Sequence, residues 1–117
     1  MPQEDHDRRI DYIEFPVLDL EAAKRFYSTV FGWSFTDYGP DYSSFADGRL
    51  SGGFAKASTV QPGGPLVVMY ALDLASTKDA VVTAGGKITK DVFEFPGGKR
   101  FQFRDLSGYE LAVWSDK

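Results

Sequence analysis

The segment LDLEAAKRFYSTVFGWSFTD at residues 18–37 decides the fold, because a related segment, LDLASTKDAVVTAGGKITKD, follows at residues 72–91. The two segments share seven identities over twenty ungapped positions, which is more than chance provides. An internal repeat of this kind indicates that one supersecondary unit occurs twice and that neither copy can bury its apolar face alone.

Each copy is expected to contain one helix. Asp19 and Asp73 are good N-caps, and apolar residues follow both at helical spacing. Gly32 ends the first helix, and Gly85-Gly86 ends the second.

Strands are expected on both sides of each helix. One apolar run precedes each helix, and three short extended runs separated by turn residues follow it. The expected strands are 10–17, 33–38, 42–46 and 50–57 in the first copy, and 66–72, 87–95, 99–105 and 109–115 in the second. The sequence therefore predicts one α+β domain over residues 1–117, with two βαβββ modules at about 9–57 and 66–115, a linker at 58–65, and half-sheets that share a core.

Composition narrows the possible functions. A net charge of −4 argues against binding of a nucleic-acid backbone, and the cations Lys99, Arg100 and Arg104 are expected on a solvated strand face. The chain has no cysteine and a single histidine, His6, so any catalysis would rest on carboxylates, Tyr, Lys, Arg or Ser. No apolar run approaches the roughly 20 residues of a membrane span, and the charged start is unlike a signal peptide, so a cytoplasmic protein is expected.

Two stretches carry a resemblance to a known superfamily. The string FPVLDLEAAKRFY at residues 15–27, closed by VFGW at residues 30–33, and the closing stretch FQFRDLSGYEL at residues 101–111 resemble vicinal-oxygen-chelate domains of the glyoxalase, bleomycin-resistance and dioxygenase type. The resemblance implies sheets that curl into a cup. It also implies a divalent metal held by His, Glu or Gln from the first and last strands of each module.

The positions that the resemblance assigns to metal ligands do not hold suitable side chains. They fall on Tyr12, on Leu66 or Val67, near Gly52–Phe54, and on Ala112. A divalent metal needs several N or O donors in a fixed geometry. We therefore expect no metal centre and no other cofactor.

Strand alternation predicts which side chains line the cup. Glu14 and Glu110 form either an acid/base pair in a partly desolvated cup, with one pKa raised toward neutrality, or two solvated carboxylates, and the second alternative is favoured. Tyr12 either donates a hydrogen bond to a ligand or fills space. The expected ligand-binding residues are Tyr12, Glu14, Leu66, Val68, Tyr70, Glu110, Ala112 and Trp114.

Other residues have two interpretations each. Trp33, Phe35 and Tyr38 either form a wall for a planar ligand or pack in the core, and packing is favoured. Trp114 either lines the cup or contacts a second copy. Asp105 is expected to set the turn before the last strand through bonds to backbone N–H groups.

Three functions remain open. The first is metal-independent binding of a small apolar or aromatic molecule in a cavity made by two chains, which implies a homodimer. The second is a glyoxalase-type isomerase, lyase or transferase that uses Glu14 or Glu110, with or without a hard divalent metal. The third is a dimeric interaction module whose cup is filled by Tyr12, Tyr70 and Trp114. Of these three functions, metal-independent binding of a small molecule is modestly favoured.

Overall fold

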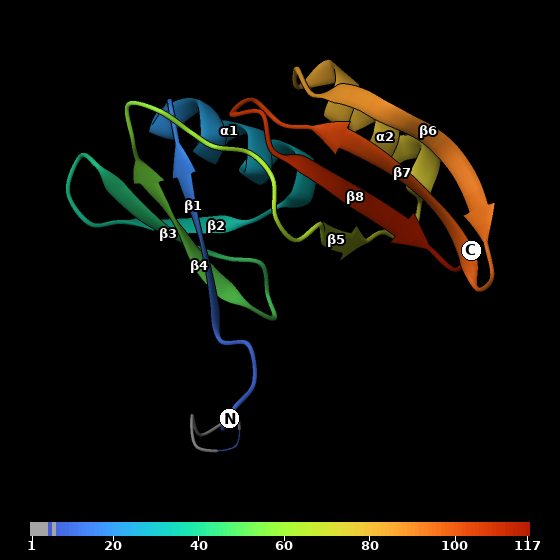
Figure 1. The fold of residues 1–117 in the computed structure, drawn as a ribbon, viewed down its shortest axis with the longest axis horizontal. Coiled ribbons are helices and arrows are strands. Elements are labelled where there is room, and N and C mark those ends of the chain that lie inside the picture. The colour runs from blue at the N-terminus through green and yellow to red at the C-terminus, as the bar shows by residue number, and fades with distance from the viewer. Residues whose placement is uncertain (1–4, 6) are drawn as a thin grey trace.

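The predicted order of strands and helices is confirmed by a computed structural model, which describes residue 5 and residues 7–117. His6 lies outside the described residues. The first module contains β1 (Tyr12–Val17), α1 (Leu20–Phe31), β2 (Ser34–Asp37), β3 (Tyr42–Ala46) and β4 (Ser51–Lys56) (Figure 1). The second contains β5 (Val67–Tyr70), α2 (Leu74–Thr83), β6 (Lys87–Phe95), β7 (Gly98–Arg104) and β8 (Glu110–Ser115).

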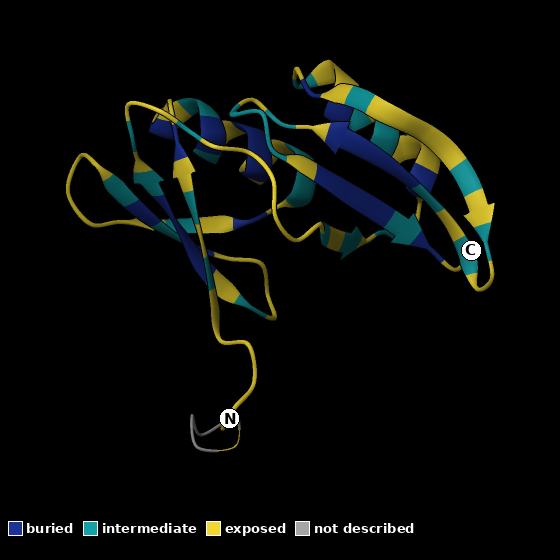
Figure 2. Ribbon diagram, viewed as in Figure 1, coloured by how far each residue is buried: buried dark blue, intermediate teal, exposed yellow. Residues whose placement is uncertain are grey.

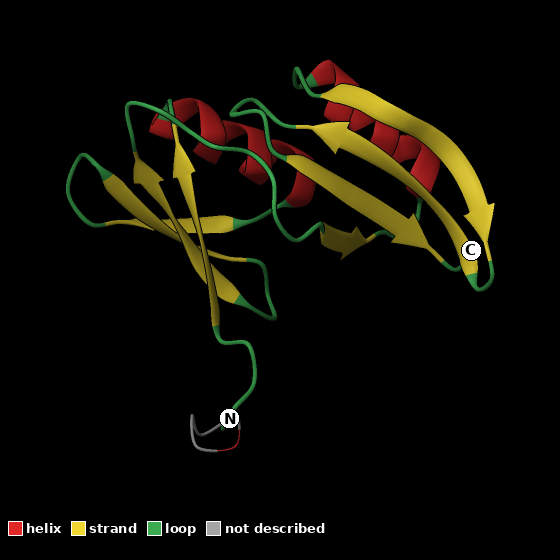
Figure 3. Ribbon diagram, in the orientation of Figure 1, coloured by secondary structure: helices red, strands yellow, loops and turns green. Residues whose placement is uncertain are grey.

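The two modules have the same sheet topology (Figure 3). The strand orders are β1-β4-β3-β2 and β5-β8-β7-β6. The first strand of each module pairs in parallel with the last, and the other neighbours are antiparallel. This arrangement makes β1 and β5 edge strands and completes an α+β fold of two βαβββ modules. In the described part of the chain, neither helix has the length and apolar character needed to span a membrane.

The sequence repeat corresponds to repeated contacts. Lys24 Nζ lies 2.8 Å from Asp37 Oδ1, and the repeat-related Lys78 Nζ lies 2.6 Å from Asp91 Oδ1. The hydrogen bond from each lysine lowers the pKa of the aspartate that accepts it. Each ion pair ties a helix to a strand of its own module, which explains why these identities stand at matching positions in both copies.

The helix ends follow the predicted capping pattern. The Asp19 side chain accepts a hydrogen bond from the Ala22 N–H, and Asp73 accepts one from the Ser76 N–H, both at 3.0 Å. Gly32, at φ 72°, ends α1 in the left-handed conformation that favours glycine.

Aromatic residues fill much of the core. Figure 2 shows buried segments, in dark blue, in α1 and in the central strands of the sheets. The Trp33 ring stacks between Tyr27 and Phe45, at centroid distances of 4.6 and 4.4 Å, and only 8% of the residue is exposed. Phe35 packs on Phe54 at 5.7 Å. Packing is thus the correct interpretation for these two residues, and a ligand wall that includes Trp33 is wrong because the ring is enclosed in the core.

Helix α1 also joins the two modules. Its Phe26 ring lies 6.2 Å from the Phe103 ring of β7. The Tyr27 hydroxyl donates a hydrogen bond of 2.8 Å to Asp105, in the turn between β7 and β8. Burial raises the pKa of both Tyr27 and Asp105. The α1 aromatics therefore pack on one sheet and anchor the turn of the other.

The Asp105 turn continues this connection to β1. The Asp105 carboxylate accepts hydrogen bonds from the Ser107 and Tyr109 N–H groups, at 3.0 and 2.9 Å. These are the bonds to backbone N–H groups that the sequence predicts for this turn. The Tyr109 hydroxyl then donates to the Pro16 carbonyl on β1, at 2.8 Å. Pro16 lies on an edge strand, where proline is tolerated.

We expect Tyr27→Phe to lower the free energy of unfolding by about 2 kcal/mol, because it removes a hydrogen bond to a buried carboxylate. Chemical denaturation of the variant and the wild type measures the difference. Tyr38→Phe is the matched control, since Tyr38 is 65% exposed and lies outside this network. Equal stability of both variants would contradict the joining role of Tyr27.

Candidate functional site

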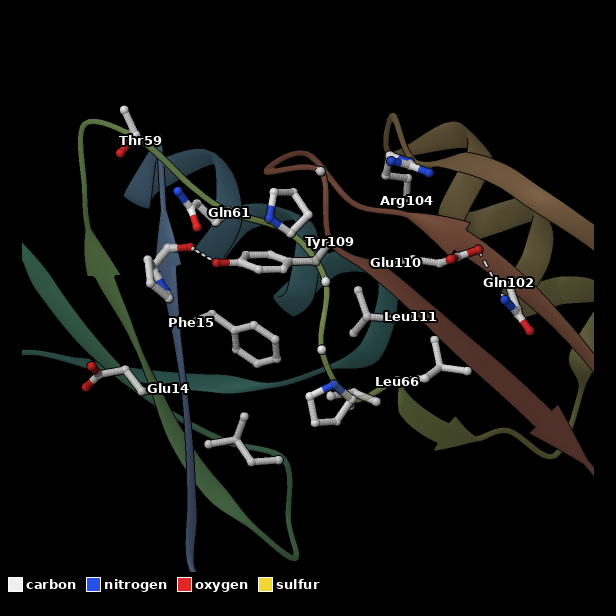
Figure 4. Close-up of a pocket in the computed structure, with 18 of the residues that line it drawn as sticks. Glu14, Phe15, Thr59, Gln61, Leu66, Gln102, Arg104, Tyr109, Glu110 and Leu111 are labelled. Carbon is white, nitrogen blue, oxygen red and sulfur yellow. Dashed lines mark hydrogen bonds between the residues drawn. The ribbon is translucent and has the colours of Figure 1, made fainter.

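A groove of about 980 Å³ lies between β1 and β8, beside the linker that connects the modules (Figure 4). Its floor includes Phe15 and Tyr109, whose rings meet edge to face at 5.4 Å. Apolar side chains from both modules form most of its walls, and polar side chains stand among them. The apolar residues are Ile10, Ile13, Phe15, Pro16, Pro62, Pro65, Leu66, Val67, Tyr109 and Leu111, and the polar ones include Glu14, Gln61, Gln102, Arg104 and Glu110.

The groove exists because β1 and β8 belong to different sheets. Each strand is hydrogen-bonded within its own module, and no strand ladder connects them. The linker residues 61–65 pass between the two sheets and line the opening, together with Leu66 and Val67. Within this linker, Gly63 and Gly64 adopt positive φ angles of 133° and 85°.

The structure places three of the expected ligand-binding residues in this groove: Glu14, Leu66 and Glu110. The others, which are Tyr12, Val68, Tyr70, Ala112 and Trp114, lie outside its lining. Strand alternation is correct for β1, where Tyr12 and Glu14 are exposed and Val17 is buried. However, the groove lies between two separate sheets, so residues that face the core also line it.

The side chains of Glu14 and Glu110 point away from one another (Figure 4). Glu14 accepts a hydrogen bond from the Tyr42 hydroxyl at 2.9 Å. Glu110 accepts hydrogen bonds from the Thr89 hydroxyl at 2.5 Å and the Gln102 amide at 3.1 Å. These bonds lower the pKa of Glu110, which is opposite to the rise that the acid/base alternative requires of one carboxylate.

Tyr12, Tyr42 and Glu14 form a hydrogen-bonded chain on the exposed face of the first sheet. The two hydroxyl oxygens lie 2.5 Å apart. Since the Tyr42 proton is directed to Glu14, Tyr12 donates to Tyr42. Burial and these two bonds raise the pKa of Tyr42. Gly53 leaves room for the chain, because a Cβ at that position would lie 2.0 Å from the Tyr42 hydroxyl oxygen.

The residues at the family's metal-ligand positions do not fit a metal. Tyr12 is engaged with Tyr42, and Leu66 and Ala112 carry no donor. Across residues 7–117 and residue 5, no group of three or more His, Cys, Asp or Glu side chains is placed to hold a metal ion. Glu14 and Glu110 do not replace the missing donors, because they point in opposite directions.

Tyr70 and Trp114 form a separate aromatic cluster at the far end of the second sheet. Their rings meet at 5.2 Å, and Phe95 lies 6.2 Å from Trp114. The Tyr70 hydroxyl donates to Asp116. Ala112 is fully buried and lies outside the groove lining.

Several groove residues were not identified from the sequence. Ile13, Phe15 and Leu111 alternate along their strands with residues that are expected to line the cup, so strand alternation does not predict them as lining residues. No sequence pattern predicts the bond from the Tyr109 hydroxyl to β1. The linker was identified only as a connection. Arg104 is expected on a solvated strand face, and its alternation with Phe103 on β7 could have placed Gln102 on the same face.

The chain belongs to the glyoxalase/bleomycin resistance protein/dioxygenase superfamily, whose family model matches residues 9–113. A glyoxylase-like domain-containing protein of Didymella fabae is 33% identical and aligns with 90% of this chain and 91% of its own length.

Solved structures show the same fold. A glyoxalase/bleomycin resistance protein/dioxygenase family enzyme from Burkholderia phytofirmans PsJN is similar with a TM-score of 0.82 at 16% identity, covering 92% of this chain and 100% of that one. A glyoxalase-related enzyme from Fulvimarina pelagi is similar with a TM-score of 0.80 at 21% identity, covering 92% of this chain and 88% of the other.

Proposed function

We propose that this protein binds a small apolar or aromatic molecule in the groove between β1 and β8, without a metal. The main observation in favour is the groove itself, which has a volume of about 980 Å³ and mainly apolar walls. Pockets of this size and character are typical of small-molecule sites, in which a few polar groups orient the ligand. Here Gln102, Arg104 and Glu110, which line the groove on the side of the second module, supply such polar groups.

The chemistry of Glu110 favours binding over catalysis. A general base works best when its pKa is near the working pH, whereas two hydrogen bonds lower the pKa of this carboxylate. Its oxygen Oε2 already accepts both of those bonds. Glu110 is therefore better suited to fixing the orientation of Gln102 than to removing a proton.

We also propose a homodimer, because both edge strands beside the groove expose apolar side chains. Ile10 and Tyr12 are exposed at β1, and Val68 and Tyr70 are exposed on β5. A second copy would cover these edges, which otherwise present unpaired backbone groups and apolar surface to water. A cytoplasmic location is proposed as well, on the basis of the sequence.

To test the binding site, we predict that Leu66→Glu weakens the binding of the neutral dye Nile red by about tenfold or more, since a charge in an apolar wall must be desolvated on binding. Fluorescence titration measures the affinity. Leu72→Glu is the matched control, because Leu72 is 71% exposed and lies outside the groove lining. A chelator is expected to leave the wild-type affinity unchanged.

Two results would contradict the proposed site. One is equal dye affinity of the wild type and Leu66→Glu. The other is binding that disappears with the chelator and returns with a single added metal.

For the dimer, we predict that the wild type elutes at twice the mass of one chain and that Val68→Lys shifts it to the monomer, because a lysine on β5 would be buried without a partner. Light scattering coupled to gel filtration measures the mass. Val82→Lys on α2 is the control, since Val82 is also exposed but lies away from both edges. A monomeric wild type would contradict the dimer.

A further inference from the structure

The second sheet has an exposed face opposite α2, and this face carries a group of cations. On β7, Phe101 and Phe103 are fully buried toward the core, so the alternating Arg100, Gln102 and Arg104 lie on the other side. We call this side the open face of the second sheet. Its neighbouring strand β6 contributes Lys90 and Phe93.

Two of these cations share one aromatic ring. Lys90 Nζ lies 5.2 Å from the centroid of the Phe93 ring, and Arg100 Cζ lies 5.3 Å from it. No carboxylate within residues 7–117 forms an ion pair with either cation. Neither positive charge is therefore balanced by a paired carboxylate, and an anion that binds beside the Phe93 ring would be attracted by both.

The Arg100 guanidinium is incompletely hydrogen-bonded. Its one hydrogen bond to the described chain runs from Nη2 to the Gln102 side-chain oxygen, at 3.1 Å. The Nε atom is buried and has no acceptor in that part of the chain. A buried donor without an acceptor is costly, and such a group calls for an explanation, of which a ligand is one.

Glu110 does not neutralise this surface. Thr89 and Gln102 both donate to its carboxylate, and Lys90 and Arg104 act on it only through space. Lys90, Arg100 and Arg104 carry three positive charges against the one negative charge of Glu110. The local excess of positive charge stands out in a chain whose net charge is −4.

Gln102 connects the open face with the groove. It lines the groove, donates to Glu110 and accepts from Arg100. Arg100 lies two residues further along β7, or roughly 7 Å at strand spacing. A ligand that reaches this distance from the groove would place a substituent beside the guanidinium.

We propose that the ligand of this groove is an aromatic carboxylate. Its planar body occupies the apolar groove, and its carboxylate is bound by Arg100 and Lys90 on the open face of the second sheet. This inference rests on the proposed function and specifies the ligand class of the same site. A guanidinium is well suited to a carboxylate, since charge-assisted hydrogen bonds are stronger than neutral ones.

Calorimetric titration of the full chain with naphthalene-2-carboxylate and its neutral amide, naphthalene-2-carboxamide, tests the proposal. The wild type is expected to bind the carboxylate about tenfold more tightly than the amide, in line with charge-assisted bonding. Arg100→Gln should abolish this preference and leave the affinity for the amide unchanged. Arg100→Lys should retain part of the preference, and Arg49→Gln, in the turn between β3 and β4, should retain all of it.

The outcomes separate this inference from the function on which it rests. Equal wild-type affinity for both probes, or a preference that survives in Arg100→Gln, overturns the carboxylate site and leaves the apolar groove standing. Binding of neither probe overturns both proposals. If Arg100→Gln does not fold, Lys90→Gln provides the same test, since Lys90 is exposed on β6, and an unchanged preference in that variant contradicts the proposal.

Discussion

The hydrogen bond from Tyr27 to Asp105 fixes the two modules relative to one another. The Tyr27 ring packs against Trp33 and Phe54 of the first module, while its hydroxyl reaches the turn between β7 and β8 of the second. The same carboxylate holds the Tyr109 backbone, and the Tyr109 hydroxyl returns to β1. The width of the groove between β1 and β8 therefore depends on a network that begins in the core.

The two halves of the repeat keep the same scaffold but present different surfaces. The caps at Asp19 and Asp73 and the lysine–aspartate pairs recur in both modules. The exposed face of the first sheet carries the Tyr12–Tyr42–Glu14 chain above a glycine, whereas the second carries cations and aromatic rings. The repeated contacts thus give both modules the same fold, whereas the side chains on their exposed faces differ. This difference makes the site asymmetric, which suits a ligand with one apolar end and one charged end.

The sequence predicts best those features that are set by residues close together in the chain. N-caps, terminal glycines and turn residues act over a few positions, so the helices and most strand limits follow from them. Strand alternation also separates Glu14 from Val17 correctly. The groove could not be predicted in this way, because it depends on how two sheets sit together. Glu14 and Glu110 occupy related faces in the repeat, yet the packing of the modules directs them apart. The bonds of Tyr27 and Tyr109 join residues far apart in the sequence, and neither residue type reveals its partner.

The groove is proposed to hold an apolar ligand without a metal. A crystal structure of the full chain, grown with naphthalene-2-carboxamide and Mn²⁺ together, tests it most directly. We expect the ligand between β1 and β8, in contact with Phe15, Leu66 and Leu111, and no anomalous manganese signal at Tyr12, Glu14 or Glu110. Manganese bound by Glu14 or Glu110, with the aromatic probe absent from the groove, would rule out this mode of binding and favour metal-dependent chemistry.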